Sequence, residues 1–422
     1  MVDVSDMVVG VVEDSRGFAE LEEEWEDLYR RCPRATPFQS WTWLYSWWEC
    51  YELRLITVRN SRGLLIGIFP FMVEFGSVYV GRLLFVGTEL SDYLDVIVRS
   101  GWEDKVLESG VQALEKLECW HIADLQQLPQ EAAAWGVRRW WDGPRICLRR
   151  DSCPVVEVKP CDELLASLSR NLRSTVRRTL RRAATDGLQR KVADASNIKH
   201  AAERLVALHR EAWQRRDIGP EHVTQRFEAP TVAATQRLAY RGLGTISEFW
   251  QDGEVLISDF LMFGRAYCGS YILGASQKAP QRYQWSSLYI WDAVEIAHIG
   301  DSSAHIGDSS YLDLLRGEKP YKLRWSSWII PTHRLILGQH RTARIPYAGY
   351  HALRSRAKLY AGSGSAPLWI KSAVGKYRTL RHRVNHSRDN LVTGVFNIFR
   401  PTGASRVVPS NLETMHSLTG VT

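Results

Sequence analysis

The residues best suited to chemistry lie between positions 311 and 325, where a short apolar run leads into a turn with charged and phenolic side chains. The run from Tyr311 to Leu315 is long enough for a buried strand, which Gly317 and Pro320 then end. Proteins of the α/β class commonly hold functional residues where a buried strand ends in a polar turn. A surface hairpin with solvated charges would have the same composition, so both interpretations stay open at this point.

A second group of polar residues comes from a repeat. The heptapeptide at residues 297–303 recurs without change at residues 304–310. Its His298, Asp301, His305 and Asp308 are residue types that bind metal ions, but duplicated turn residues explain them better. Two copies are too few for a repeat architecture, and removing one leaves an ordinary helix, turn and strand. We interpret the repeat as a duplication that lengthens a loop, and we expect no metal.

The composition is that of an ordinary globular protein. Of the 422 residues, 45% are hydrophobic and 24% are charged, and a chain of this length suits two or three domains. The 17 tryptophans gather in runs such as residues 41–48, which favours packing over ring-stacking platforms. The seven cysteines are scattered, odd in number and without a C-x-x-C pair, so they indicate reduced core residues rather than disulfides or a zinc site.

Charge and hydropathy bear on partners and location. No window holds the roughly 18 consecutive apolar residues of a membrane span, and the first residues lack the basic region of a signal peptide. We therefore expect a cytoplasmic protein. The net charge of +7 comes from the tail, because residues 331–390 contain 12 Lys or Arg against one acid. Residues 336–422 are predicted to be a basic, partly helical or flexible tail, suited to an anionic membrane surface.

The first 150 residues predict a strand, two helices, a meander of strands, a helix and a strand. The strands are expected at residues 8–12, 53–58, 64–73, 78–86, 93–98 and 121–125. The second helix is expected at residues 38–48 with Ser40 as its N-cap, and a further helix at residues 106–117.

A second, similar order of elements follows a boundary at residues 150–162, in which residues 155–158 suit a crossing strand. A basic helix ends at Gly187, and its arginines suit either the binding of a phosphate or a helix face exposed to solvent. Helices at 198–216 and 221–240 precede strands at 244–250, 254–263 and 266–273, the first two joined by an Asp-Gly turn. A helix at 288–297, capped by Ser286 or Ser287, leads to the strand at 311–315. The common order predicts two related α/β units in tandem, at residues 1–150 and 151–335.

Four segments carry a resemblance to a known family. They are Pro37-Phe38-Gln39-Ser40 with Trp43 and Trp47-Trp48; Ser91-Asp92-Tyr93-Leu94-Asp95; Leu168-Ser169-Arg170-Asn171 with the arginine pairs Arg177-Arg178 and Arg181-Arg182; and Asp313-Leu314-Leu315-Arg316-Gly317 with Tyr321-Lys322. In this order they resemble acetyltransferases of the CelD/BcsL type (BioF2-like), a branch of the GNAT superfamily related to the Fem-type aminoacyl transferases.

The resemblance implies an α/β (α+β) fold with tandem GNAT-like acyl-CoA N-acyltransferase domains, each a mixed twisted sheet flanked by helices. It also implies transfer of an acyl group from acetyl-CoA to an amine or hydroxyl of a small-molecule or glycan acceptor, often a sugar or polysaccharide precursor. The acyl donor would lie between splayed strands at residues 266–273 and 311–315, with Arg282, Ser286 and Ser287 at its phosphates. Tyr271, Arg316 and Gly317 would complete this binding site. The segment 282–287 departs from the family because it has no glycine to admit close phosphate approach.

Direct transfer needs a base for the acceptor and a proton donor for the leaving thiolate. Tyr321 and Lys322 suit acid or electrostatic roles, and Asp259, Glu248 and Asp313 suit the base; each could instead make structural hydrogen bonds. Two other functions stay open. A Fem-like transferase would take an aminoacyl group from tRNA, the one nucleic acid we expect as a partner, and a non-catalytic scaffold would bind anionic lipid or polymer through the tail.

Overall fold

The computed structural model describes residues 7–48, 52–75, 81–214, 225–265, 267–280, 282–299 and 310–339. Residues 300–309, which include most of both heptapeptide copies, and the basic tail from residue 340 lie outside these ranges. Among the residues described, we find no helix with the length and apolarity that a membrane crossing requires.

The first half of the sheet alternates with five short or medium helices. Its strands are β1 (Val8–Val12), β2 (Glu52–Arg59), β3 (Leu65–Phe75), β4 (Gly81–Phe85), β5 (Ile97–Val98) and β6 (Ile122–Leu128). Its helices are α1 (Ser15–Glu20), α2 (Glu22–Arg30), α3 (Trp41–Leu44), α4 (Glu103–Lys116) and α5 (Val137–Trp140), with 3-10 turns η2 (Pro37–Gln39) and η4 (Ala133–Gly136).

The second half contains two helices, a three-stranded meander, and a strand-helix-strand unit. Its strands are β8 (Gln189–Val192), β9 (Gly244–Gln251), β10 (Glu254–Phe263), β11 (Tyr267–Ala275) and β12 (Tyr311–Asp313). Its helices are α6 (Cys161–Ser167), α7 (Arg170–Thr185), α8 (Ile198–Gln214), α9 (Gln225–Tyr240), α10 (Trp285–Ile299) and α11 (Pro320–Trp325).

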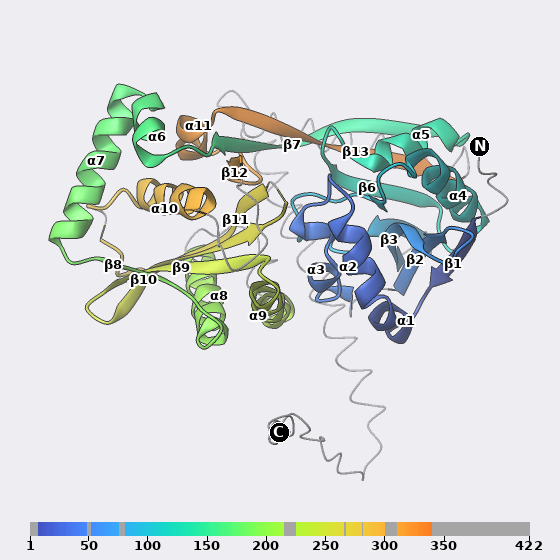
Figure 1. Ribbon diagram of the computed structural model, residues 1–422, viewed down its shortest axis with the longest axis horizontal. Helices are drawn as coiled ribbons and strands as arrows, with labels where there is room; N and C mark the ends of the chain where they lie inside the picture. Colours follow the sequence, from blue (N-terminus) through green and yellow to red (C-terminus); the bar gives the residue numbers. More distant parts are fainter. Residues whose placement is uncertain are drawn as a thin grey trace, which may run out of the picture. The chain divides into compact units, whose positions relative to one another are not determined.

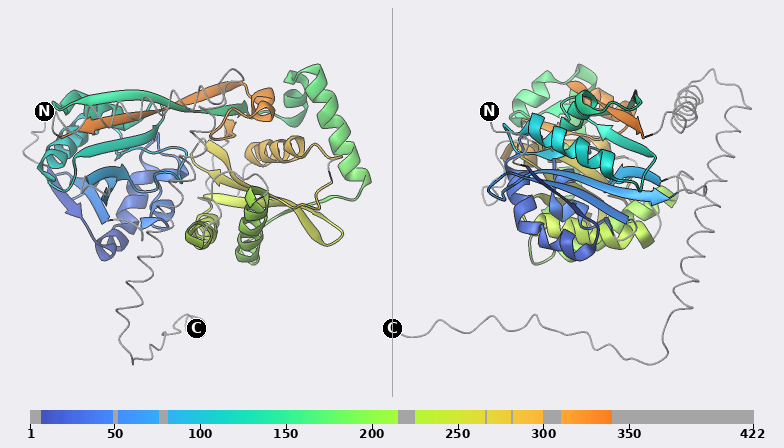
Figure 2. Two further views of the ribbon diagram at one scale, coloured as in Figure 1. Left: turned by 180° about the vertical axis from the view of Figure 1, so that it is seen from behind. Right: turned by 90° about the vertical axis from the view of Figure 1, so that its right-hand side faces the viewer.

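Two long strands, β7 (Arg145–Glu157) and β13 (Trp328–Gly338), pair along most of their length and join the halves (Figures 1 and 2). The strand order is β1-β2-β3-β4-β6-β13-β7-β12-β11-β10-β9-β8, with β5 beside β3. The last described strand therefore returns to the first half, where it pairs with β6. The expected division between the two units, at residue 150, falls within β7. That the chain consists of two GNAT-like units stays a proposal.

Helices cover both faces of this mixed sheet, which confirms the expected α/β class (Figure 1). In β2, Leu55 packs into the core under α1–α3, whereas the next residue, Ile56, packs into the core under α4 and α5. This alternation is the period-two pattern of a strand buried on both sides. Trp25, Trp43 and Trp120 are each 0% exposed, which confirms that these tryptophans serve packing.

Most expected elements are present, and two were predicted too long. Of the strand expected at residues 93–98, only β5 forms, because the backbone before it bonds elsewhere: the Tyr93 carbonyl accepts the Gln39 side chain at 2.8 Å. The helix expected at residues 38–48 is divided into η2 and the single turn α3, although Ser40 caps α3 as predicted by accepting the Trp43 amide. The expected turn at Asp252 and Gly253 is confirmed, since both have φ near +50° to +80° as a two-residue hairpin requires.

Asp95 explains how the loop before β5 is held. Its carboxylate accepts the amides of Val96, Ala133 and Ala134 at 2.7–2.8 Å, which fixes the start of η4. Burial raises the pKa of Asp95 to about 7, although these three amide bonds lower it. The last acid of the Ser91–Asp95 motif is therefore part of the fold.

We expect the substitution Asp95→Ala to lower the free energy of unfolding by about 2–4 kcal/mol, because it leaves three amides without their acceptor. Urea denaturation followed by circular dichroism measures this. Asp104→Ala is the control, because Asp104 is 72% exposed in its pair with Arg139 and should contribute under about 1 kcal/mol. Equal effects of the two substitutions would contradict the role given to Asp95.

Candidate active site

The strands β11 and β12 run parallel but stay together only briefly. Tyr267, Cys268 and Gly269 pair with Tyr311, Leu312 and Asp313, after which β12 ends while β11 continues to Ala275. Helix α10 connects them and packs on one face of the sheet, opposite α8 and α9 (Figure 1). The predicted parallel pairing of these two strands is confirmed, and β11 continues beyond Gly269 after its pairing with β12 has ended.

The chain turns sharply where β12 ends. The Asp313 carboxylate, 0% exposed, accepts the Tyr93 hydroxyl at 2.6 Å and the Leu315 amide at 2.7 Å. Burial raises the pKa of Asp313 to about 7, although the Tyr93 hydrogen bond lowers it. Leu315 has φ +58°, a left-handed conformation that costs energy for a branched side chain and often occurs at functional sites.

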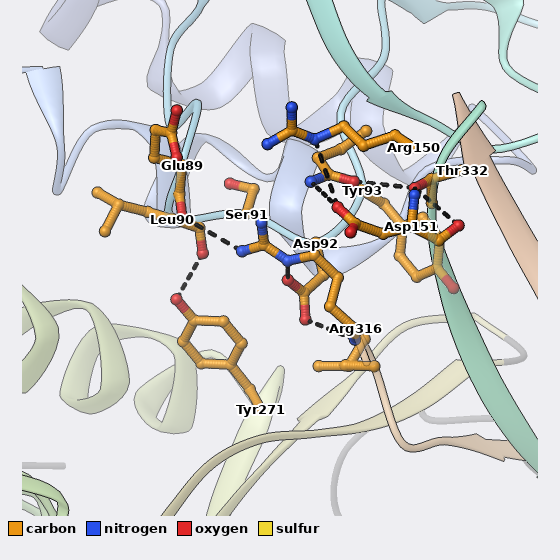
Figure 3. Close-up of polar contacts among 12 residues, drawn as sticks. Glu89, Leu90, Ser91, Asp92, Tyr93, Arg150, Asp151, Tyr271, Arg316 and Thr332 are labelled. Carbon is orange, nitrogen blue, oxygen red and sulfur yellow. Dashed lines mark hydrogen bonds and ion pairs between the residues drawn. The ribbon is translucent and has the colours of Figure 1, made fainter. Parts of the chain in front are cut away.

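Arg316 connects this turn to the first half of the sheet (Figure 3). Its guanidinium pairs with Asp92 and also donates to the Glu89 carbonyl at 3.2 Å. Glu89 is a further left-handed residue, with φ +78°. Burial acts to lower the pKa of Arg316, but the charges of Asp92 and Asp151 outweigh it and raise the pKa, so the arginine stays charged.

Tyr271 of β11 makes a second connection to the same loop. Its hydroxyl donates to the Leu90 carbonyl at 2.5 Å (Figure 3). Its ring packs edge-on against Phe38 and Trp43, and the Trp43 indole donates to the Ser91 hydroxyl at 2.9 Å. Three of the four segments that carry the family resemblance therefore meet here.

Lys322 of α11 holds the turn from the other side. Its ammonium donates to the carbonyls of Leu314, Leu315 and Arg316 at 2.5–3.3 Å. Three acceptors take up all three protons of an ammonium group. Burial lowers the pKa of Lys322, and this effect outweighs the charges of Asp92 and Asp313, which raise the pKa. These contacts position the turn, which is the structural alternative that the sequence left open for this lysine.

Asp259 of β10 lies on the α10 face of the sheet. Both carboxylate oxygens accept the Ser270 hydroxyl, at 2.9 and 3.0 Å, and the side chain is 2% exposed. Burial raises the pKa of Asp259 to about 8. The hydrogen bond from Ser270 and the charge of Lys322 lower this pKa, whereas the charge of Asp292 raises it further. A raised pKa favours the protonated form of Asp259, which suits a proton donor better than the base expected from the sequence.

The raised pKa of Asp259 predicts how stability depends on pH. The folded state keeps a proton that the unfolded chain releases between about pH 4 and about pH 8, so this residue makes stability fall as pH rises through that window. We expect Asp259→Asn, which can keep the Ser270 contact, to remove on the order of 2–5 kcal/mol of that fall. Urea titrations at pH 5 and pH 8.5 compare the two proteins. If the free energy of unfolding falls equally in the wild type and the variant between pH 5 and pH 8.5, the raised pKa of Asp259 is contradicted.

The start of α10 differs from the prediction. The helix begins at Trp285, so neither Ser286 nor Ser287 is its N-cap; the Gln284 carbonyl accepts the amides of Ser287 and Leu288. Arg282 pairs with Asp186 at 3.0 Å and is 50% exposed. A phosphate at this position would therefore share the guanidinium with Asp186, and the amide of Ser287 is already bonded at 2.7 Å.

The structure brings some of the predicted site residues together. Arg316, Gly317 and Lys322 form one turn, in which the Gly317 amide donates to the Ser152 carbonyl at 3.0 Å and φ is +105°. Tyr321 is close by, with its ring edge-on to Tyr289 of α10. Arg282, Ser286 and Ser287 form a separate group at the start of α10, and no contact joins them to this turn among the residues described.

Sequence reasoning did not assign chemistry to Asp92 and Tyr93, although it singled out their motif. Both are buried polar residues that contact the turn after β12, more than 200 positions along the chain. The available signal was an acid beside a phenol in a polar segment after a glycine-bounded strand. Only the fold shows which residues they face.

Comparison with known families matches one part of the chain. Residues 170–323 match the family described as acetyltransferase (GNAT) domain. No curated protein matches the chain closely enough to serve as a relative.

Several solved structures share the fold. FemX has 12% identity and a TM-score of 0.53, over 74% of this chain and 95% of its own. A conserved protein of unknown function from Bacteroides thetaiotaomicron has 12% identity and a TM-score of 0.52, over 78% of this chain and 100% of its own. L-PGS from Bacillus licheniformis has 13% identity and a TM-score of 0.50, over 82% and 98%. These matches show that the chain has a GNAT-like fold, and residues 170–323 are the part of it that matches the acetyltransferase (GNAT) domain family.

Proposed function

We propose that the protein transfers an acyl group from a thioester, most simply acetyl-CoA, to an amine or hydroxyl acceptor. The observation that carries this proposal is the parallel β11 and β12 pair inside the matched GNAT domain, whose pairing ends at Gly269 and Asp313. The backbone of β11 beyond Gly269 would hold the donor, and the start of α10 would offer Arg282 and Ser286 to its phosphates. The resemblance to CelD/BcsL-type enzymes favours a sugar or polysaccharide precursor as the acceptor.

In this reaction the acceptor attacks the thioester carbonyl and gives up its own proton to a base or to water, the carbon–sulfur bond breaks, and the thiolate takes a proton. We propose protonated Asp259 as one source of that proton through the Ser270 hydroxyl, with Tyr321 as the other candidate. Arg316, Gly317 and Tyr271 would shape the mouth of the site, and Lys322 would position the turn.

Thiol release from acetyl-CoA, with a panel of amine, hydroxyl and sugar acceptors, tests the proposal, with mass spectrometry of the product. We expect acceptor-dependent release and acetyl-CoA binding by calorimetry. No release with any acceptor, together with no acetyl-CoA binding, would overturn the proposal.

A Fem-like transfer from aminoacyl-tRNA is the second candidate. It is favoured by α7, whose Arg170, Arg177, Arg178 and Arg181 are exposed on one described helix. Tight tRNA binding that weakens steeply with salt would support it over acetyl-CoA. A scaffold role of the basic tail, including contact with anionic membranes, depends on residues outside those described. Deleting residues 341–422 and measuring liposome binding and activity tests it.

A further inference from the structure

A groove lies between the α5 region and the β7–β13 pair. Its cavity volume is about 600 Å³, within the usual range for small-molecule sites. Its polar lining consists of Gln130, Trp135, Arg138, Cys147, Arg149 and His333. None of these residues belongs to β11, β12 or the turn after β12, so the groove is distinct from the proposed acyl-transfer site.

Two cations in this groove lack an acidic partner among the residues described. Arg138 and Arg149 are both exposed, and no ion pair is formed by either. Their chain neighbours behave differently: Arg139 pairs with Asp104 at 3.2 Å, and Arg150 pairs with Asp151 at 3.3 Å. Two unpaired guanidinium groups over one cavity favour a ligand with negative charge.

A flat ring stands beside these charges. The Trp135 indole is fixed by a hydrogen bond from its nitrogen to the Pro129 carbonyl at 2.8 Å. The Arg138 guanidinium lies 5.7 Å from the centre of this ring, and His333 meets it edge-on, also at 5.7 Å. Trp135 thus offers an ordered surface on which a planar group can stack.

His333 also lines the groove. It is directly opposite Arg149 in the β7–β13 register, so both side chains point to the same side of the sheet. Its Nδ1 atom is buried, so the rest of the ring forms its part of the groove wall.

We propose that this groove binds a phosphorylated ligand with a planar ring, of the nucleoside diphosphate class. The phosphates would lie on Arg138 and Arg149, and the ring would stack on Trp135. This site goes beyond the acyl-donor function, and its ligand is separate from the thioester.

Calorimetry with GDP and UDP tests the site, because neither is a part of coenzyme A. We expect both to bind the wild-type protein, and Arg138→Ala and Arg149→Ala to weaken binding at least tenfold. Arg139→Ala is the matched control, since Arg139 is an adjacent exposed arginine that already has a partner, and it should bind as the wild type does. Trp135→Leu should weaken GDP but leave pyrophosphate unchanged. No binding of either nucleotide, or binding that Arg138→Ala and Arg149→Ala leave unchanged, would overturn the proposal.

Cys147 gives an independent readout in the unmodified protein. This thiol is exposed and lines the groove, whereas Cys161 is partly exposed on α6. We expect GDP to slow maleimide labelling of Cys147 at least fivefold, by peptide mass spectrometry, and to leave Cys161 unchanged. Equal labelling of Cys147 with and without saturating GDP would contradict binding in this groove. Neither result depends on acyl-transfer activity.

Discussion

Replacing Arg316 with alanine is expected to lower the free energy of unfolding by about 3–5 kcal/mol and to remove acyl transfer. Arg316 lies in the matched GNAT domain, whereas its partner Asp92 belongs to the first half of the sheet and has only 8% of its side chain exposed. Without the guanidinium, Asp92 would be a buried carboxylate without its counter-charge, and the Glu89 carbonyl would lose a donor.

Urea denaturation and the thiol-release assay measure these effects. Arg324→Ala is the matched control, because Arg324 is an exposed arginine on α11 and its loss should change stability by under about 0.5 kcal/mol. A double-mutant cycle with Asp92→Ala should give a coupling energy of about 1–3 kcal/mol. Additive single effects would show that the two side chains do not stabilise one another.

Replacing Arg334 with alanine is expected to cost a similar 3–5 kcal/mol, about the value for breaking a buried ion pair. Arg334 is on β13 and pairs with Asp124 of β6; the side chains are 6% and 0% exposed. This pair lies where the last described strand returns to the first half of the sheet, so the loss should loosen β13 and with it the β7–β13 connection.

The exposed pair of Arg139 and Asp104 provides the comparison for Arg334. Its side chains are 66% and 72% exposed, so Arg139→Ala should cost under about 1 kcal/mol in the same urea titrations. The double variant Asp124→Leu with Arg334→Met should recover most of the stability lost in Arg334→Ala, because no buried charge is left unpaired. A double variant as unstable as Arg334→Ala would indicate that packing, not charge, is the source of the loss.

The left-handed residues support the choice of site. Glu89, Gln127 and Leu315 have φ between +58° and +78°, and each contacts the junction between the halves through its backbone or side chain. Such conformations persist only where surrounding contacts fix them, and here the contacts are those of Arg316, Asp151 and Asp313. These three residues therefore take conformations that their own preferences disfavour and that contacts from distant parts of the chain fix.

The sequence alone determined the local structure of this protein. Period-two apolar runs predicted the meanders, the Asp252-Gly253 turn predicted the β9–β10 hairpin, and the family resemblance of the sequence implied the β11 and β12 pair. The meanders and the hairpin depend on residues close together in the chain, so spacing and turn chemistry are sufficient to find them.

Only the tertiary structure decided which distant side chains meet. The pairing of β13 between β6 and β7, the Asp92–Arg316 ion pair and the Tyr93–Asp313 hydrogen bond each join residues that are far apart in sequence. It likewise showed that Lys322 binds three carbonyls and that Asp259 is buried enough to keep its proton. Such roles depend on burial and strand register, which follow from the packing of the whole chain and not from any one segment.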